Sequence, residues 1–278
     1  MNIMVTGVTG GYGGYAVEYL KEFAPNDDIY VLVRNEEKAK DFNDVNVRVG
    51  DYADADSMIE ALKDIDRLLF VSVSIPGIQK NVVEAAKVND VKYIAYTSLF
   101  GLENPKFGLE INHRETEELI KASGIRHAFL RDNWYVEMPA SYLNACKKYG
   151  KYIYFSDEGV VSWALKREYA EAGARVIADG SYEGILNLSN TPITYKELGE
   201  AFNLETELVS RKEFENVLSK LDISDIGAML TLTYQDYAQA GGNGEDEGNP
   251  TEFEKILGHP LTPYSEAIEE VIEKNLFL

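Results

Sequence analysis

The glycine-rich stretch at residues 1–14 constrains the fold of this chain more than any other feature. An apolar run at residues 2–5 has strand character, and glycines recur through residues 6–14 directly after it. A helical pattern begins at once, with one apolar face formed by Ala16, Val17, Leu20 and Phe23. Strand, glycine turn and helix, in this order, are the context that a dinucleotide-binding fingerprint requires.

Each glycine of the turn has a physical task in such a site. Gly7 makes the tight turn, Gly10 lets backbone N–H groups approach a pyrophosphate, and Gly13 lets the helix pack closely on the strand. The phosphates then lie at the positive end of the helix. The spacing is a variant of the familiar Gly-x-Gly-x2-Gly pattern, and the alternative is an ordinary structural turn.

Composition bounds the class of protein. With 278 residues, one large or two unequal domains are expected. No apolar window is long enough for a transmembrane helix, and the single Cys146 excludes an internal disulfide. Because the chain runs directly into a strand, we expect no signal peptide. A net charge of −20 disfavours nucleic acid and anionic membranes as partners, so a cytoplasmic protein is expected. Cys146 is interpreted as a buried, inert thiol.

Buried strands recur along the chain, and helical patterns separate the early ones. The apolar runs lie at residues 3–5, 29–33, 45–49, 68–73, 93–96, 127–130 and 185–188. This alternation predicts a doubly wound parallel α/β sheet. We expect one domain at residues 1–133 and a smaller, mostly helical lobe at 134–278, with residues of about 160–190 returning to the sheet. Residues 238–250 are expected to form a mobile surface loop.

The second strand ends in a basic residue, which bears on the choice of cofactor. Arg34 follows residues 29–33, and Lys38 lies one helical turn further on. An acidic side chain here favours NAD, whereas an arginine suits the 2′-phosphate of NADP. We therefore predict that Arg34 and Lys38 bind NADP(H), the alternative being two solvated surface cations.

Polar residues at the next strand ends extend this site. Asp51 either accepts from an adenine amino group or caps the following helix. Small and polar residues end the fourth and fifth strands, and carboxyl ends of parallel strands face the ligand crevice. These residues are Ser72, Val73, Ser74 and Thr97.

Several spaced motifs together resemble the NmrA-like branch of the atypical short-chain dehydrogenases. They are residues 6–13, 33–39, 50–52, 91–98, 131–135 and 257–260, so that the resemblance runs almost from end to end. It implies a Rossmann domain that holds NADPH and a C-terminal lobe that closes a substrate cleft. By position, Gly7, Thr9, Gly10, Gly11, Tyr12 and Gly13 border the pyrophosphate and Asn133 borders the nicotinamide. Residues 162–167 also approach the cleft in this family.

Ordinary short-chain dehydrogenases carry a catalytic Tyr-x3-Lys pair, which this chain lacks. Leu109 and His113 stand at the aligned positions. Alcohol–ketone chemistry by that route is therefore disfavoured, whereas hydride transfer to a quinone mainly requires positioning. His113 is a candidate hydrogen-bond donor to the substrate, with a structural histidine as the alternative.

The aromatic corner after the sixth strand indicates the substrate. Asn133 is a candidate catalytic residue, and Trp134 and Tyr135 are candidates for stacking on a planar ring, unless they belong to the core. The resemblance implies an NADPH-dependent reductase of quinones or similar electron-poor aromatics. Reduction of arylmethane or azo dyes, and redox sensing without turnover, stay open as alternatives. No metal site is expected, and either a monomer or a homodimer is compatible with the sequence.

Overall fold

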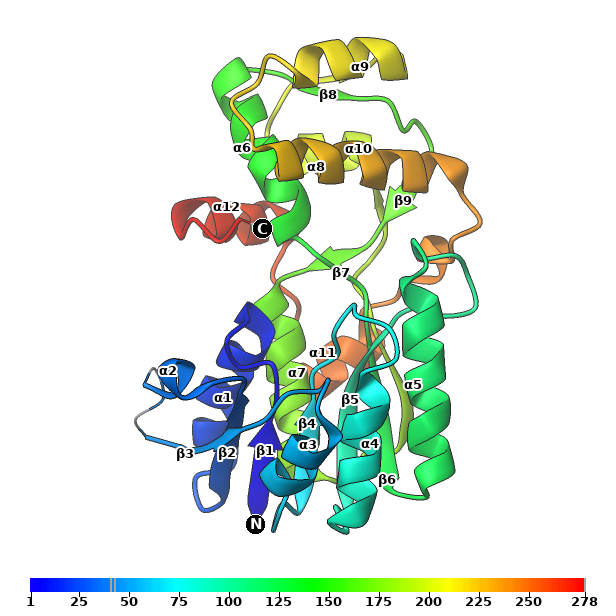
Figure 1. Ribbon diagram of the computed structural model, residues 1–278. Helices are drawn as coiled ribbons and strands as arrows, with labels where there is room; N and C mark the ends of the chain where they lie inside the picture. Colours follow the sequence, from blue (N-terminus) through cyan, green and yellow to red (C-terminus); the bar gives the residue numbers. More distant parts are fainter. Residues whose placement is uncertain (41, 43, 278) are drawn as a thin grey trace. The chain divides into compact units, whose positions relative to one another are not determined.

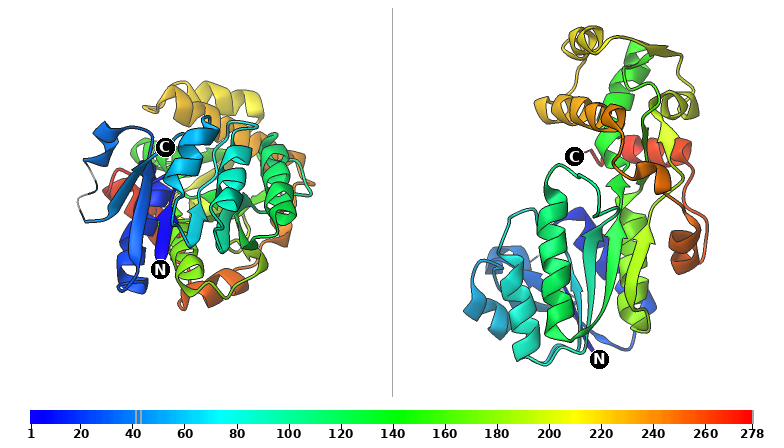
Figure 2. Two further views of the ribbon diagram at one scale, coloured as in Figure 1. Left: turned by 60° about the horizontal axis from the view of Figure 1, so that its bottom comes forward. Right: turned by 90° about the vertical axis from the view of Figure 1, so that its right-hand side faces the viewer.

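The computed structural model describes residues 1–40, 42 and 44–277. The chain forms two compact units, each built from several segments (Figures 1 and 2). Unit 1 comprises residues 1–132, 167–188 and 252–258, and unit 2 comprises residues 133–166, 189–251 and 259–278.

Unit 1 is organised around one parallel sheet. Its strands are β1 (Asn2–Val5), β2 (Asp28–Val33), β3 (Asn46–Val49), β4 (Arg67–Phe70), β5 (Tyr93–Leu99), β6 (Arg126–Asp132) and β11 (Gly184–Leu188). The order is β11-β6-β5-β4-β1-β2-β3, and every neighbouring pair is parallel. The order reverses beside β1, where doubly wound sheets bind their ligands. Each of the seven predicted strands is present in this sheet, so the predicted fold class is confirmed.

Helices cover both faces of the sheet (Figure 1). One face carries α1 (Gly11–Phe23), α7 (Lys166–Asp179) and α11 (Thr251–Leu257), and the short α2 (Glu36–Ala39) follows β2. The other face carries α3 (Ala55–Ala61), α4 (Gln79–Val88) and α5 (Leu109–Ser123). Apolar side chains on this second face form a continuous core, which includes Met58, Val82, Ile120 and Phe129. Burial on both faces explains the apolar runs of the inner strands, whereas the edge strands β3 and β11 are partly exposed and include polar residues.

Unit 2 is mostly helical. Its helices are α6 (Glu137–Tyr149), α8 (Tyr195–Ala201), α9 (Arg211–Leu218), α10 (Asp225–Ala240) and α12 (Tyr264–Glu273), with a 3-10 helix η1 (Glu245–Glu247). Two-stranded pairings join β7 (Trp134–Tyr135) to β10 (Trp163–Ala164), β9 (Val160–Val161) to β12 (Ile193–Thr194), and β8 (Tyr152–Tyr154) to β13 (Thr206–Leu208). Thr194 and Ser210 begin α8 and α9 with reciprocal capping boxes.

The segment at residues 238–250 differs from its prediction as a surface loop. Asn243 and Glu245 are buried, with exposed fractions of 6% and 0%. The loop prediction was wrong, since residues 238–240 end α10, Glu245–Glu247 form η1, and Ala238 is buried as well. Buried hydrogen-bond donors attract the Glu245 carboxylate, which composition alone does not reveal. The part of the chain that the structure describes holds no helix long and apolar enough to cross a membrane.

Candidate functional site

An open cavity lies at the carboxyl ends of the central strands of unit 1. Its volume is about 570 Å³, and its wall joins the glycine turn after β1 to the ends of β2, β3 and β4. The lining residues are Gly7, Thr9, Leu32, Val33, Arg34, Gly50, Asp51, Tyr52, Ala53, Val73, Ser74, Ile75 and Ile78. Apolar walls with a few polar groups at the edges are typical of a site for a nucleotide-sized ligand.

The glycine turn after β1 is compact because side chains are missing where the backbone comes close to itself. Gly7 has a φ of +64°, which L-residues rarely adopt. A Cβ atom on Gly13 would lie 2.6 Å from the carbonyl carbon of Gly7, so that only glycine lets α1 start this close to β1. At Gly10 the nearest atom to such a Cβ is the Gly7 oxygen at 3.4 Å, so the backbone there is open.

The first turn of α1 presents backbone donors. Gly10 is the N-cap residue and supplies no side-chain acceptor, and the first turn holds no acidic residue. Helix N-termini leave N–H groups without intrahelical acceptors, which suits a phosphate anion. Gly10 and Gly11 are exposed, whereas the Tyr12 side chain is buried, its hydroxyl 2.4 Å from where a Cβ on Gly173 of α7 would lie. Gly173 thus makes room for Tyr12, and only the backbone of Tyr12 belongs to this donor set.

Of the three charged residues predicted to bind the cofactor, two line the cavity and one does not. Arg34 and Asp51 both line it and are exposed, whereas Lys38 is exposed on α2 outside its wall. The N-cap alternative for Asp51 is wrong, since Asp54 caps α3 by accepting from Ser57 N. Asp51 instead accepts from Ala53 N at 2.9 Å, which fixes its carboxylate at the rim.

Of the residues predicted to face the ligand crevice at the ends of the fourth and fifth strands, only two line the cavity. Val73 and Ser74 line the cavity. Ser72 and Thr97 instead bond to each other, because Ser72 N donates to Thr97 Oγ1 at 2.8 Å and Thr97 Oγ1 donates to Ser72 Oγ at 3.1 Å. These bonds join the chain after β4 to β5.

His113 lies on α5 with only 9% of its surface exposed. Its Nδ1 is 3.0 Å from the Tyr96 hydroxyl, and burial lowers the pKa of His113 to about 4 against the opposing effect of Glu117. The imidazole is therefore neutral near pH 7 and already has a protein partner. This placement favours the structural alternative, and a catalytic role for His113 stays a prediction.

Asn133 and Trp134, the predicted substrate-side residues, converge in unit 2 on a residue that sequence reasoning missed. Asn133 Nδ2 donates to Glu245 Oε2 at 3.0 Å, and Trp134 Nε1 donates to Glu245 Oε1 at 2.9 Å. The Tyr237 hydroxyl and Ser162 N also donate to this carboxylate, at 2.8 and 3.3 Å. Glu245 therefore fixes the side-chain orientations of Asn133 and Trp134. Nothing in the local sequence sets it apart from Asp246 and Glu247.

Tyr135, next along this corner, is half-buried and more accessible than Trp134. The Lys166 ammonium group lies 5.1 Å from the centre of its ring, and burial lowers the pKa of Lys166. The positive charge of Lys166 is attracted to the electron-rich face of the Tyr135 ring, a cation–π contact. Of the predicted stacking pair, Tyr135 is the one whose ring retains exposed surface.

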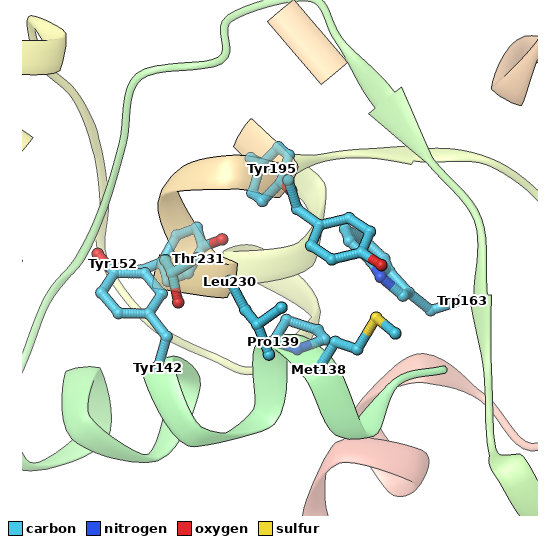
Figure 3. Close-up of a pocket in the computed structure, with 9 residues that line it drawn as sticks. Met138, Pro139, Tyr142, Tyr152, Trp163, Tyr195, Leu230 and Thr231 are labelled. Atoms are coloured by element: carbon cyan, nitrogen blue, oxygen red, sulfur yellow. The ribbon is translucent and has the colours of Figure 1, made fainter. Parts of the chain in front are cut away.

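Unit 2 also encloses a small aromatic cavity of about 10 Å³, just enough for one water molecule (Figure 3). Its walls are formed by Met138, Pro139, Tyr142, Tyr152, Trp163, Tyr195, Leu230, Thr231 and Tyr234. Among the described residues, the hydroxyls of Tyr152 and Tyr195 and the indole N–H of Trp163 find no hydrogen-bond partner. The cavity is too small for an aromatic substrate. Within the described residues no His, Cys, Asp and Glu side chains group into a metal site.

The parallel sheet, its glycine turn and the cavity beside it define a Rossmann-type dinucleotide-binding protein. The chain belongs to the NAD(P)H-binding family, which matches residues 7–152, and to its NmrA-like reductases. The predicted family is thereby confirmed, as is a nicotinamide dinucleotide as cofactor.

Individual relatives cover nearly the whole chain. Quinone oxidoreductase 2 of Escherichia coli is 31% identical over 98% of this chain and 99% of its own. The structure of the E. coli NADPH-dependent quinone oxidoreductase complexed with NADPH has a TM-score of 0.82 at 30% identity, covering 97% of this chain and 99% of that one. The Citrobacter sp. triphenylmethane reductase complexed with NADP(H) has a TM-score of 0.83 at 29% identity, with the same coverage.

Proposed function

We infer that this protein is an NADPH-dependent reductase that transfers hydride to a quinone or a similar planar, electron-poor aromatic acceptor. The observation that carries the inference is the cavity of about 570 Å³, whose wall joins the glycine turn to Arg34. The end-to-end similarity to a quinone oxidoreductase supports the choice of acceptor.

The residues present fit the cofactor. Gly7, Thr9 and the first-turn N–H groups of α1 would hold the pyrophosphate, because the backbone is open at Gly10 and lacks acidic neighbours. Arg34 would hold the 2′-phosphate with its fork of donors, and Asp51 would accept from the adenine amino group. NADPH, when bound, supplies the hydride, so the protein is left with binding and orientation.

Proton delivery asks little of this chain. Leu109 and His113 stand where a tyrosine and a lysine would be needed, and His113 is buried beside Tyr96. A quinone that accepts a hydride can take its proton from solvent, since the product oxygens are basic. His113→Ala is therefore expected to lower turnover by no more than about tenfold, the effect of one ordinary hydrogen bond. A loss of three orders of magnitude with NADPH affinity intact would make His113 the general acid.

A second candidate function is the reduction of triarylmethane dyes, favoured by the similarity to the Citrobacter reductase. Both substrate classes are conjugated, electron-poor acceptors of hydride. A screen that follows NADPH consumption over simple quinones and cationic dyes separates the two, and consumption with neither class would favour an NADP(H) sensor.

The cofactor assignment is tested by Arg34→Glu. A carboxylate in place of the guanidinium should weaken NADPH binding by about 2–4 kcal/mol while NADH binding holds. Lys87→Glu is the matched control, because it makes the same charge change at an exposed position in the last turn of α4 that does not line the cavity. Unchanged constants for both cofactors in Arg34→Glu would show that the 2′-phosphate lies elsewhere.

A further inference from the structure

Asp132 is a buried acid that the roles described above leave unused. It is the last residue of β6, its exposed fraction is 4%, and neither carboxyl oxygen has a hydrogen-bond partner among the described residues. Burial raises the pKa of Asp132 well above its ordinary value, which favours the neutral acid with one O–H donor. Buried polar groups are almost always partnered, so an exception of this kind needs an explanation.

Arg131, the preceding residue of β6, is a buried charged group that does have a partner. Arg131 donates to both carboxylate oxygens of Glu117 on α5, at 3.0 and 2.9 Å. Successive strand residues point to opposite faces, so Asp132 points away from α5. Leu130, two residues earlier, lies against Gly173 of α7 on that opposite face. Asp132 thus lies on the face that carries α1 and α7, one step nearer than Leu130 to the carboxyl edge of the sheet.

The position of Asp132 at the end of β6 corresponds to the nicotinamide half of a dinucleotide site. Arg34 and Asp51 line the cavity at the ends of β2 and β3, on the β1–β3 side of the point where the strand order reverses, and this part of the cavity suits the adenosine half. The rest of the wall includes residues that follow β4. The other half of a dinucleotide lies over the carboxyl ends of β4, β5 and β6 in a doubly wound sheet. Asp132 ends β6, in register with Leu99 of β5. It is therefore on the nicotinamide side of the glycine turn.

We propose that the Asp132 carboxyl group pairs with the carboxamide of the nicotinamide ring and so fixes the orientation of that ring. This rests on the proposed use of NADPH. A neutral carboxyl group and a primary carboxamide each offer one donor and one acceptor side by side, so the two match with two hydrogen bonds. The pairing gives the unpartnered O–H an acceptor and selects nicotinamide over a ring without the amide.

The contact requires a movement of the side chain. The carboxyl oxygens are enclosed by protein, so rotation about the Cα–Cβ bond must bring them toward the edge of the sheet. In the enclosed position this rotation breaks no hydrogen bond with a described residue, because the group makes none. Binding of the adenosine half needs no such movement, which makes it an internal reference.

The test compares affinities for whole and partial ligands. Dissociation constants of wild type, Asp132→Ala and Asp132→Asn are measured for NADPH and for 2′,5′-ADP, which lacks the nicotinamide half. Asp132→Ala should weaken NADPH binding about tenfold and leave 2′,5′-ADP binding unchanged, whereas Asp132→Asn, an amide with one donor and one acceptor available, should lose less than about threefold. Asp132→Val is the second variant if the alanine variant does not fold.

A ligand change checks the same contact from the other side. The 3-acetylpyridine analogue of NADP⁺ keeps the carbonyl oxygen and replaces the amino group by methyl. Wild type should favour NADP⁺ over this analogue, and Asp132→Ala should reduce that preference. The proposal is overturned if Asp132→Ala binds NADPH as wild type does, if it loses NADPH and 2′,5′-ADP equally, or if its preference between the two oxidised ligands is unchanged.

These measurements involve no acceptor, so they are separate from the test of turnover. If no quinone or dye is reduced but the affinities behave as stated, the proposed reaction fails and the role of Asp132 stands. If quinones are reduced and Asp132→Ala binds NADPH as wild type does, the proposed reaction stands and the role of Asp132 fails.

Discussion

Asp132 in unit 1 and Glu245 in unit 2 are both buried carboxyl groups, and their surroundings are opposite. Glu245 accepts hydrogen bonds from Asn133, Trp134, Tyr237 and Ser162, whereas Asp132 has no partner among the described residues. Burial costs a polar group little when donors replace its water and costs much when they do not. The comparison indicates that Glu245 stabilises its unit, whereas Asp132 lowers the stability of its own.

The largest expected effect comes from removing the well-partnered acid. Glu245→Ala leaves the donors of Trp134 and Tyr237 without this acceptor, so the free energy of unfolding should fall by about 4 kcal/mol. Urea titration followed by circular dichroism measures it. Glu247→Ala is the control, an exposed glutamate of the same 3-10 helix, and should change stability by less than about 0.5 kcal/mol. Equal effects of the two substitutions would contradict a stabilising role for the Glu245 cluster.

Substitution of Asp132 is expected to raise the free energy of unfolding rather than lower it. Asp132→Asn keeps the shape and removes the ionisable group, so the free energy of unfolding near neutral pH should rise by about 2 kcal/mol. Asp246→Asn, at an exposed position, makes the same chemical change and should be neutral. A loss of stability in Asp132→Asn would mean that the carboxyl group has a favourable partner after all.

The gain should depend on pH, with a sign fixed by the raised pKa of Asp132. Below about pH 3.9 both folded and unfolded chains hold this proton, and wild type and Asp132→Asn should approach each other in stability. As pH rises, the unfolded chain releases the proton first. The free energy of unfolding of wild type therefore decreases relative to that of Asp132→Asn until the pH passes the pKa of Asp132 in the folded protein. Urea titrations of both proteins at several pH values measure the difference. His113, whose pKa is lowered to about 4, destabilises both proteins equally as pH falls and cancels. A pH-independent difference would refute the assignment.

The smallest expected effect tests whether the donors around Glu245 act singly. Tyr237→Phe removes one of its hydrogen bonds, made at 2.8 Å, and should cost about 1 kcal/mol. Tyr149→Phe, at a ring that is 54% exposed, serves as the reference in the same urea titrations. A cost close to that of Glu245→Ala would show that the cluster is one cooperative unit.

The sequence predicted the sheet well because its signals are local. Buried parallel strands are continuous apolar runs, and each of the seven was found, although β5 and β6 extend further than expected, to Leu99 and Asp132. The residues by which these strands extend past their predicted ends are Thr97, Ser98 and Leu99 in β5 and Arg131 and Asp132 in β6. Because most of them are polar, strand ends predicted from hydrophobicity alone come too early.

The candidate site was predictable only where backbone geometry dictates the residue. Gly7 and Gly13 are required by a positive φ and by a close backbone approach, and such requirements are visible in sequence. Glu245 was not predictable, because its partner Trp134 lies more than a hundred positions away in the sequence. The lack of a partner at Asp132 was equally hidden, since it is a property of the fold.

Unit 1 is assembled from three separate stretches of chain, and this has a consequence for synthesis on the ribosome. β11, which covers the outer edge of β6, begins only at Gly184, and α11, whose Phe253 stacks on Tyr169, comes later still. Translation of the intervening residues takes about 3–10 s at ordinary rates, and during that time an apolar strand edge is open to pairing with other chains. Nascent chains of this protein are therefore expected to need a chaperone at the stage when β6 has emerged and β11 has not.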